Sequence, residues 1–378
     1  MNSSLNADSF TSGYGLFQGE QQPLMAMVEI TNKCNMACPV CFADSCNQGI
    51  DISLQIVKRK INRLHEVAGL VPLQLSGGEP TLHPHLLEIV EYARESGFRN
   101  IELVTNGIII SRKPDYLKKL VNKGLSAVYL QFDGLQTETY LKIRGCDMGD
   151  IRRQSIAVVR DAGICCTLAV AVVRGVNDGE IGDIVNFAIE NIDTVRAVNF
   201  QSATRFSGRF IMDQKRPGYS VKELKQLICN QTGIAPEGFL SRELGHPECN
   251  AMSLVFVVDG KLKPLFQYLS RESIASFLGE NKRSVILDLF MGKEKFGRKH
   301  LLNPKMWKLL QEGFGIFGQP PGLRSILDSK HILLFAKSFM ERGAMDDERI
   351  DRCNYAIAEA DEVYSFCAFN NIHRCKGG

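Results

Sequence analysis

The run TNKCNMACPVCF, residues 31–42, follows an apolar stretch and carries Cys34, Cys38 and Cys41. Thiolates so close together on one loop can hold three corners of a cubane iron–sulfur cluster. No fourth cysteine stands at a matching position, so one iron would keep an open coordination site. Such an iron can take a small ligand and pass it an electron. The spacing therefore predicts a reactive cofactor site directly after a strand.

Strand-like and helix-like stretches alternate through the first half of the chain. Strands are expected at 27–31, 72–76, 101–105, 126–132, 165–173 and 195–200, and amphipathic helices at 53–68, 84–96, 113–123, 150–162 and 179–191. This alternation implies right-handed crossovers and a parallel sheet. We expect an α/β fold, an open, partial (β/α)6 TIM-like barrel.

A second stretch, PLQLSGGEPTL at residues 72–82, ends its apolar run in Gly77, Gly78 and Glu79. Paired glycines let the backbone approach a ligand where a Cβ would collide, and Glu79 offers a carboxylate to a cationic amine. Alone, such a turn is more often an ordinary strand end. Here it follows the second predicted strand, at the edge where barrels gather their chemistry.

The cysteine run and the Gly-Gly-Glu turn resemble the radical S-adenosylmethionine (SAM) superfamily. The resemblance implies a 4Fe-4S cluster on the three cysteines, with SAM chelated to the fourth iron and its amino group at Gly77, Gly78 and Glu79. An electron from the cluster would cleave SAM to a 5'-deoxyadenosyl radical, which abstracts hydrogen from the substrate. The family usually has an aromatic residue before the third cysteine, where this chain has Val40. A structural zinc knuckle is the alternative for the cysteines.

Three more polar residues are candidates for binding SAM. Asn106 and Asp133 follow the third and fourth predicted strands, where short polar side chains can contact an entering ligand. Both precede a glycine, so ordinary turn chemistry explains them equally well. Arg144 resembles an arginine that grips the SAM carboxylate in many superfamily members, and a solvated arginine at a helix end is the alternative. No residue is assigned as catalytic.

Composition favours a cytoplasmic enzyme. The 378 residues are 44% apolar and carry a net charge of +3, which is too small a charge to suggest nucleic acid as a partner. No apolar run approaches the roughly 18 residues of a transmembrane helix, and the first residues lack the features of a signal peptide. Twelve cysteines in such a chain argue for metal chemistry over disulfides. The electron donor would be a protein such as flavodoxin or ferredoxin.

The second half is less regular, and we expect three parts: a flexible N-terminal arm at 1–22, the barrel at 23–205, and a C-terminal α+β extension at 206–378. The extension holds a second set of cysteines, Cys249, Cys353, Cys367 and Cys375. Four cysteines at the edges of elements suffice for an auxiliary 4Fe-4S cluster. The alternative is that they are buried apolar thiols.

The C-terminal half resembles the archaeal tetraether-lipid synthase group and its uncharacterised relatives, in the stretches HPEC, VFVVDGKLKP and RCNYA. This resemblance implies C–C bond formation or another modification on a lipid alkyl chain, with peripheral contact to a membrane left open. The apolar stretches SVILDLFMG and HILLFAKSFM, read as helical, would then line a tunnel. A peptide-modifying radical SAM maturase is the alternative. A non-catalytic iron–sulfur redox protein is the alternative from another class.

Overall fold

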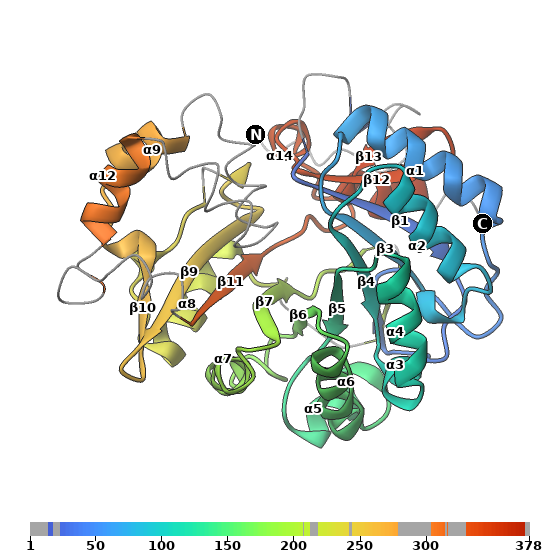
Figure 1. Ribbon diagram of the computed structural model, residues 1–378, viewed down its shortest axis with the longest axis horizontal. Coiled ribbons are helices and arrows are strands. Elements are labelled where there is room, and N and C mark those ends of the chain that lie inside the picture. Colours follow the sequence, from blue (N-terminus) through green and yellow to red (C-terminus); the bar gives the residue numbers. More distant parts are fainter. Residues whose placement is uncertain are drawn as a thin grey trace.

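The computed structural model describes residues 14–17, 23–206, 208–211, 218–241, 244–278, 304–313, 316 and 330–374. One eleven-stranded sheet runs through them in the order β10-β9-β11-β7-β6-β5-β4-β3-β1-β12-β13. The sheet curves around a central space and carries helices on its outer side (Figure 1).

Six consecutive parallel strands form the barrel half of the sheet, as the alternation predicts. They are β1 (Met25–Thr31), β3 (Leu73–Gly77), β4 (Ile101–Thr105), β5 (Ala127–Gln131), β6 (Cys165–Val172) and β7 (Val195–Ser202). Because they are parallel, their carboxyl ends meet at one edge. The predicted partial TIM-like α/β fold is confirmed.

The five predicted helices are present between these strands. They are α1 (Leu54–Ala68), α2 (Leu86–Glu95), α4 (Pro114–Lys123), α6 (Gly149–Asp161) and α7 (Ile181–Glu190), joined by the short helices α3 (Ile108–Arg112) and α5 (Thr137–Arg144). Each of the five turns apolar residues toward the sheet, as Val57, Ile61 and Leu64 of α1 do. Burying this face stabilises the barrel from outside.

The C-terminal half extends the same sheet at both ends. On one side β11 (His331–Lys337) pairs parallel with β7 and antiparallel with β9 (Asn250–Val258). On the other, β12 (Tyr355–Glu359) pairs parallel with β1 and antiparallel with β13 (Glu362–Ser365). The expected hairpin turn at Asp259-Gly260 joins β9 to β10 (Lys261–Pro264), and both turn residues have positive φ. Positive φ at both positions is what a tight two-residue hairpin requires.

Two expectations about the C-terminal half need comment. HILLFAKSFM was read as a helical stretch, but its first seven residues form strand β11. That reading was wrong because a short apolar run buried on both faces shows no clear period. SVILDLFMG at 284–292 lies outside the described residues. Residues 15–17 of the expected flexible arm pair with β13, and the three-part division of the chain stays a prediction.

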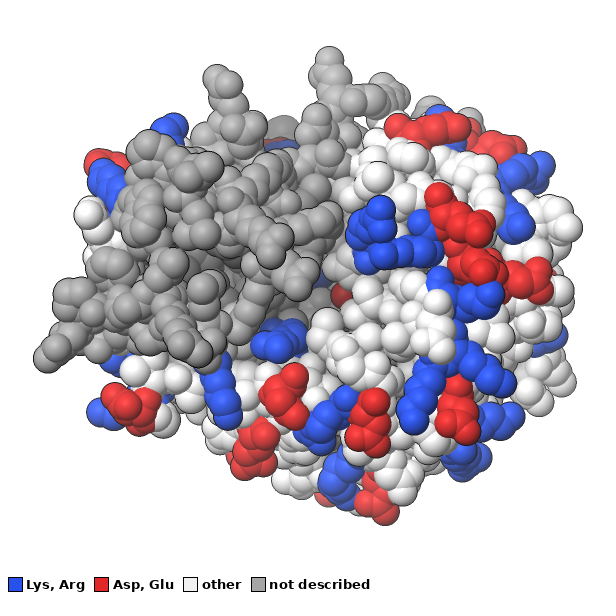
Figure 2. Space-filling model, in the orientation of Figure 1, with Lys and Arg blue, Asp and Glu red and all other residues white. Residues whose placement is uncertain are grey.

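Other helices of the C-terminal half are α8 (Val221–Thr232), α9 (Arg271–Leu278), α12 (Pro304–Gly313), α14 (Asp347–Asp351) and α15 (Phe366–Ala368). None of the helices in the described ranges has the length and apolarity needed to cross a membrane. Basic and acidic side chains are interspersed over the described part of the face in Figure 2, in keeping with the net charge of +3.

Candidate active site

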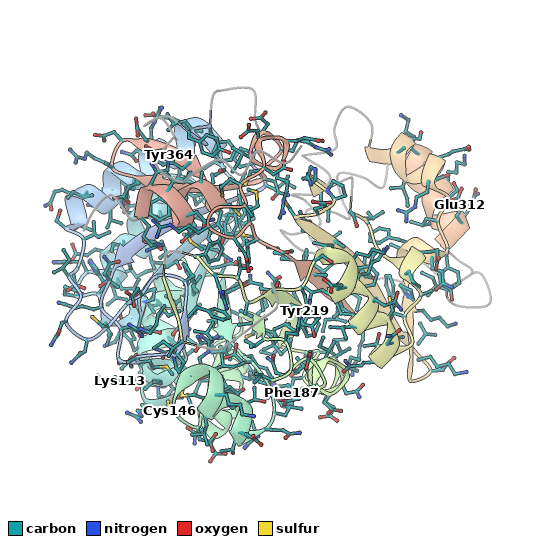
Figure 3. All side chains as sticks on the ribbon, turned by 180° about the vertical axis from the view of Figure 1, so that it is seen from behind. Lys113, Cys146, Phe187, Tyr219, Glu312 and Tyr364 are labelled. Atoms are coloured by element: carbon teal, nitrogen blue, oxygen red, sulfur yellow. The ribbon has the colours of Figure 1, made fainter. Side chains whose placement is uncertain are left out.

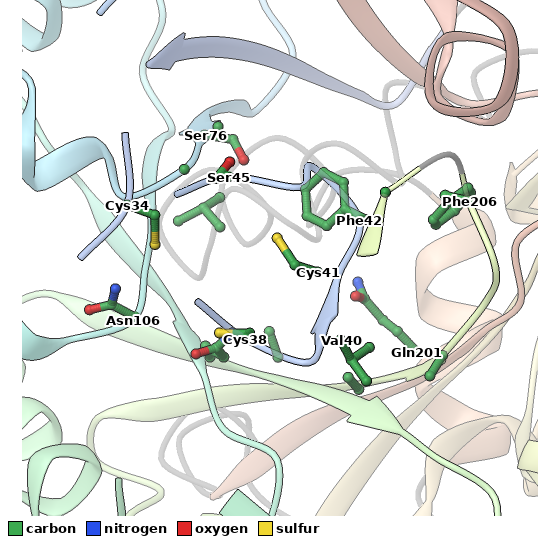
Figure 4. A pocket seen from close by; sticks show the side chains of 18 of the residues that line it. Cys34, Cys38, Val40, Cys41, Phe42, Ser45, Ser76, Asn106, Gln201 and Phe206 are labelled. Carbon is green, nitrogen blue, oxygen red and sulfur yellow. The ribbon is translucent and has the colours of Figure 1, made fainter. Parts of the chain in front are cut away.

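One cavity opens at the carboxyl ends of the barrel strands, and the three cysteines of the first motif line it. Cys34, Cys38 and Cys41 lie there together with Gly77, Gly78, Asn106 and Arg144. Figure 4 shows the three cysteine side chains around one region of this cavity, with Asn106 beside Cys34. Nine residues were predicted to hold the first cluster and SAM, and seven of them line this cavity. The two that do not are Glu79 and Asp133.

The cysteine loop is held by its backbone. Cys34 N donates to Cys46 O at 2.9 Å, and Arg209 Nη1 donates to Cys38 O at 3.0 Å. Strand β2 (Val40–Cys41) pairs antiparallel with β8 (Arg209–Phe210). These contacts hold the loop that follows β1 against the segment that contains β8.

Close backbone contacts, which the sequence does not reveal, require glycine at both positions 77 and 78. A Cβ on Gly77, whose φ is +122°, would lie 2.2 Å from Thr31 O, and one on Gly78 would lie 2.1 Å from Lys33 O. Gly78 N donates to Thr31 O, and Glu79 N to Lys33 O. The glycines therefore let the start of the cysteine loop dock on the end of β3, while they also line the cavity.

Glu79 is buried and bonds to two residues that line the cavity, Thr105 and Asn106. Its Oε1 accepts hydrogen bonds from Thr81 and from Thr105 Oγ1, and its Oε2 accepts one from Asn106 N at 2.7 Å. Burial raises the pKa of Glu79, and these hydrogen bonds oppose the shift. Glu79 is not among the described residues that line the cavity. In this structure it bonds Asn106 and the strand ends, and its expected contact with the SAM amine stays a prediction.

Asp133 and Arg144 form a buried bidentate ion pair. Arg144 Nε and Nη2 donate to the Asp133 carboxylate at 2.6 and 2.7 Å, and Arg144 Nη1 donates to Val40 O at 2.9 Å. The nearby carboxylate raises the pKa of Arg144 despite its burial. Asp133 is fully buried and is not among the described residues that line the cavity, and its contact with SAM stays a prediction. Arg144 lines the cavity, but its fork clamps the cysteine loop to the barrel.

Burial disfavours the free thiolate form of two of the three cysteines. Burial raises the pKa of Cys34 to about 12, and burial also raises that of Cys38, with Arg144 opposing. A coordinating metal supplies the charge that deprotonates such a thiol. Within the described residues no group of three His, Cys, Asp or Glu converges on a single ion. A cubane, which binds each thiolate through a different iron, does not require such convergence.

Polar and aromatic residues that the sequence reading missed line the deeper part of the cavity. Polar side chains come from inside the barrel: Gln74, Ser76, Tyr129, Gln131, Gln201 and Ser202. Tyr355 and Phe366, from the C-terminal half, stack with centroids 4.9 Å apart and planes 5° apart. Polar residues at alternate positions of an otherwise apolar strand, such as Tyr129 and Gln131 in AVYLQ, were the available signal.

The second set of cysteines is assembled from three separate elements. Cys249 precedes β9, Cys353 precedes β12, and Cys367 lies in α15. Burial raises the pKa of Cys353 to about 11, with Cys249 adding to the shift, and it raises that of Cys367, with Cys353 and Cys249 adding to it. The three thiols are therefore near one another. Cys375 lies outside the described residues.

The remaining cysteines are scattered. Cys146, on the outer side of the barrel (Figure 3), is exposed, whereas Cys166 and Cys229 are buried. Cys165 and Cys166 belong to β6, as expected.

The chain is similar to several known proteins. A model of the radical SAM superfamily matches residues 28–188. A 7,8-dihydro-6-hydroxymethylpterin dimethyltransferase of Methanocaldococcus jannaschii is 30% identical over 93% of this chain and 77% of its own length. A probable GTP 3',8-cyclase of Methanothermobacter thermautotrophicus is 31% identical over 45% of this chain; the match spans about half of that cyclase, 55% of its length.

Among solved structures, SuiB of Streptococcus suis bound to the precursor peptide SuiA is 16% identical, with a TM-score of 0.46 over 55% of this chain and 45% of its own. The match to the pterin dimethyltransferase extends over nearly the whole chain, whereas the superfamily model covers the cysteine loop and the barrel up to α7, without β7. The chain belongs to the radical SAM superfamily and is an enzyme.

Proposed function

We propose that Cys34, Cys38 and Cys41 hold a 4Fe-4S cluster, with SAM beside it against Gly77, Gly78 and Asn106. The observation that carries this is the single cavity that these residues line. Such a cluster supplies the electron that cleaves SAM and yields the radical that takes hydrogen from a C–H bond. The chain's own residues orient the reactants: Arg144 clamps the cysteine loop, and Glu79 fixes the backbone of Asn106.

The acceptor that we favour is a small planar ring compound of the pterin type. A relative that is 30% identical over 93% of this chain has a pterin compound in its name. The cavity adds a physical reason, because the stacked rings of Tyr355 and Phe366 offer a flat apolar wall beside amide and hydroxyl groups. Flat aromatic side chains with a few placed polar groups are typical of sites for such ligands.

A lipid alkyl chain, the acceptor inferred from the sequence, stays as a second candidate. Its support is the apolar part of the wall, where Phe42, Phe206, Phe339 and Phe366 line the cavity. A ribosomally made peptide is the third candidate. Mass spectrometry of lipid, peptide and pterin extracts from cells with and without the protein separates the three, since only one class should change.

We also propose that Cys249, Cys353, Cys367 and Cys375 hold an auxiliary 4Fe-4S cluster. The support is the mutual proximity of the first three thiols and their place in the chain. Cys353 precedes Tyr355 by two residues, and Cys367 follows Phe366 directly, so two of the thiols adjoin the aromatic wall in sequence. Alanine at Cys249, Cys353 and Cys367 together should lower bound iron from about eight to about four per chain. Unchanged iron would exclude the auxiliary cluster.

A cytoplasmic location and a flavodoxin or ferredoxin as electron donor complete the proposal. The activity is tested by anaerobic reconstitution with iron and sulfide, followed by SAM and dithionite. We expect 5'-deoxyadenosine and methionine in equal amounts. Absence of 5'-deoxyadenosine from protein with a full complement of iron would refute the proposed function.

A further inference from the structure

Tyr129 stands at the centre of a hydrogen-bond array inside the barrel. Its hydroxyl oxygen accepts a hydrogen bond from Asn199 Nδ2 at 2.7 Å and another from Gln201 Nε2 at 2.6 Å. Both acceptor positions of the oxygen are thus used. Within the described part of the chain no group accepts the hydroxyl proton, and Tyr129 lines the cavity. With the Asn199 amide in this orientation, which leaves its own Oδ1 buried without a partner, the proton is available to a ligand.

The side chains near Tyr129 also keep hydrogen-bonding groups that no protein group in the described residues uses. Gln131 Oε1 accepts from Arg152 at 2.8 Å, which leaves the amide NH₂ of Gln131 free to donate. Gln201 uses its NH₂ on Tyr129, which leaves its carbonyl oxygen to accept. Ser76 and Ser202 are 1% and 3% exposed, and their hydroxyls lack a partner in the structure. Gln131, Gln201, Ser76 and Ser202 all line the cavity.

Unpartnered buried polar groups are costly, so this array indicates a ligand that completes it. The ligand must present acceptors and donors close together. The edge of an oxo- and amino-substituted nitrogen heterocycle does so, whereas an alkyl chain presents neither.

The charges around the cavity further restrict the class of ligand that fits it. The basic residues among those that line the cavity are Arg144 and Arg209. Arg144 is paired with Asp133 at 2.6 Å and Arg209 with Asp44 at 2.8 Å. These guanidinium groups are already matched by carboxylates, so they are poor sites for a triphosphate. The lining thus favours a ring without a phosphate chain.

We propose that Tyr129 is a specificity-determining residue that donates a hydrogen bond to an oxo group on a neutral planar nitrogen heterocycle, while Gln201 accepts from an adjacent N–H. The ring lies against the Tyr355–Phe366 wall. This inference rests on the proposed function, because it places the ring in the cavity shared with the cysteine loop. Gln74 supports the wall, since Tyr355 donates to its Oε1 while its NH₂ is held by Glu102.

The test uses full-length protein, reconstituted without oxygen, and the fluorescence of two probes. One probe is 6-hydroxymethylpterin, and the other is unsubstituted pteridine, which has the ring but neither the oxo nor the amino group. Tyr129→Phe is compared with Tyr92→Phe, which removes a hydroxyl that bonds only Asn62 on the outer surface. GTP and 1-decanol are added as competitors.

We expect Tyr129→Phe to weaken binding of 6-hydroxymethylpterin by about tenfold, since a missing partner for a buried polar group costs about that much. Binding of pteridine should stay unchanged, as should both probes with Tyr92→Phe. A merely structural role for Tyr129 would weaken both probes alike and would overturn the proposal. Equal affinity of Tyr129→Phe and Tyr92→Phe for 6-hydroxymethylpterin would overturn it too. So would GTP or 1-decanol that displaces the bound 6-hydroxymethylpterin at a concentration below that of the pterin.

A second variant and a second readout keep the result interpretable. If Tyr129→Phe does not fold, Gln201→Met serves instead and should show the same loss for 6-hydroxymethylpterin alone; no loss would count against the inference. SAM cleavage in the absence of substrate is measured in parallel. Failure of cleavage with normal pterin binding would refute the proposed function only, whereas normal cleavage without pterin binding would refute this inference only.

Discussion

The two sets of cysteines differ in how the chain brings them together. Cys34, Cys38 and Cys41 lie on one loop of eight residues, so their proximity is dictated by sequence spacing. Cys249, Cys353 and Cys367 come from three elements and meet only because β9, β11, β12 and β13 join one sheet around the barrel. The first set is a local feature, whereas the second is a product of the complete fold.

Each set also has an arginine, and the comparison extends to these residues. Arg144 clamps Val40 O and faces Cys38. Arg349 Nε lies 3.4 Å from Cys249 Sγ, and its Nη2 donates to Ser338 O at 3.1 Å. The difference is that Arg144 has a buried carboxylate partner, Asp133. Perturbing the first set should therefore affect both chemistry and stability more than perturbing the second.

The largest effect is expected from alanine at Cys34, Cys38 and Cys41 together. SAM cleavage should fall by more than about 1,000-fold, because the bound cofactor carries the chemistry. About four irons should remain if the second set binds its own cluster. Iron analysis and 5'-deoxyadenosine assays check both points. Loss of all iron would show that the two sets do not bind metal independently.

The next largest effect is expected from Gly78→Ala. The added Cβ would lie 2.1 Å from Lys33 O, a backbone atom that moves only with the cysteine loop. We expect loss of most cluster absorbance on the first set and at least about a tenfold loss of SAM cleavage, since misplacing reacting groups by about 1 Å costs up to about 100-fold. Gly179→Ala is the control, because a Cβ there meets nothing within 4 Å. Equal behaviour of the two variants would contradict the docking role of Gly78.

The sequence predicted the barrel half well, for a physical reason. Each βαβ unit buries its own apolar faces, so the period of the apolar residues reports the element. Motifs at strand ends then fall at one edge by topology alone, which is why Cys34, Gly77 and Asn106 were expected to meet. The contacts of the side chains were harder to predict. Neither the hydrogen bonds of Glu79 with Thr81 and Thr105 nor the Asp133–Arg144 ion pair follows from the spacing of the residues.

The C-terminal half was harder to predict because its pairing is not local. β11 lies between β7 and β9, and β12 lies beside β1, more than 300 residues away in sequence. No periodicity in the sequence encodes such neighbours. Tyr355 and Phe366 face each other across the local β12–β13 hairpin. This pair lies beside the barrel strands because β12 also pairs with the distant strand β1, and that neighbour has no signal in the sequence.

The buried carboxylate partner of Arg144 predicts a large loss of stability when this arginine is replaced. Arg144→Met leaves Asp133 buried without its partner, which should lower the free energy of unfolding by about 3–5 kcal/mol. Arg153→Met is the control, since Arg153 pairs with Asp150 on the surface and should cost no more than about 1 kcal/mol. Denaturant titration of both variants gives the comparison. A cost for Arg144→Met as small as that of the control would show that the buried pair contributes little.

The smallest predicted effect concerns Lys337, where the C-terminal half meets the barrel. Burial lowers the pKa of Lys337 to about 8, with Glu102 and Cys353 opposing the shift. Between this pKa and the unfolded value of 10.5, the unfolded chain binds more protons than the folded one. Stability should therefore rise with pH across this interval, because the penalty for burying the ammonium group disappears as it loses its proton.

Lys337→Met should abolish this rise. Each pKa unit corresponds to about 1.4 kcal/mol, and partial contact with solvent reduces the effect, so we expect a difference of about 1–2 kcal/mol between the two pH profiles. Unfolding by denaturant from pH 7.5 to 10.5 measures it. Parallel profiles for the wild type and Lys337→Met would mean that Lys337 reaches water in the folded protein. The junction between β11 and the barrel would then be open at that point, unlike the closed junction around Arg144.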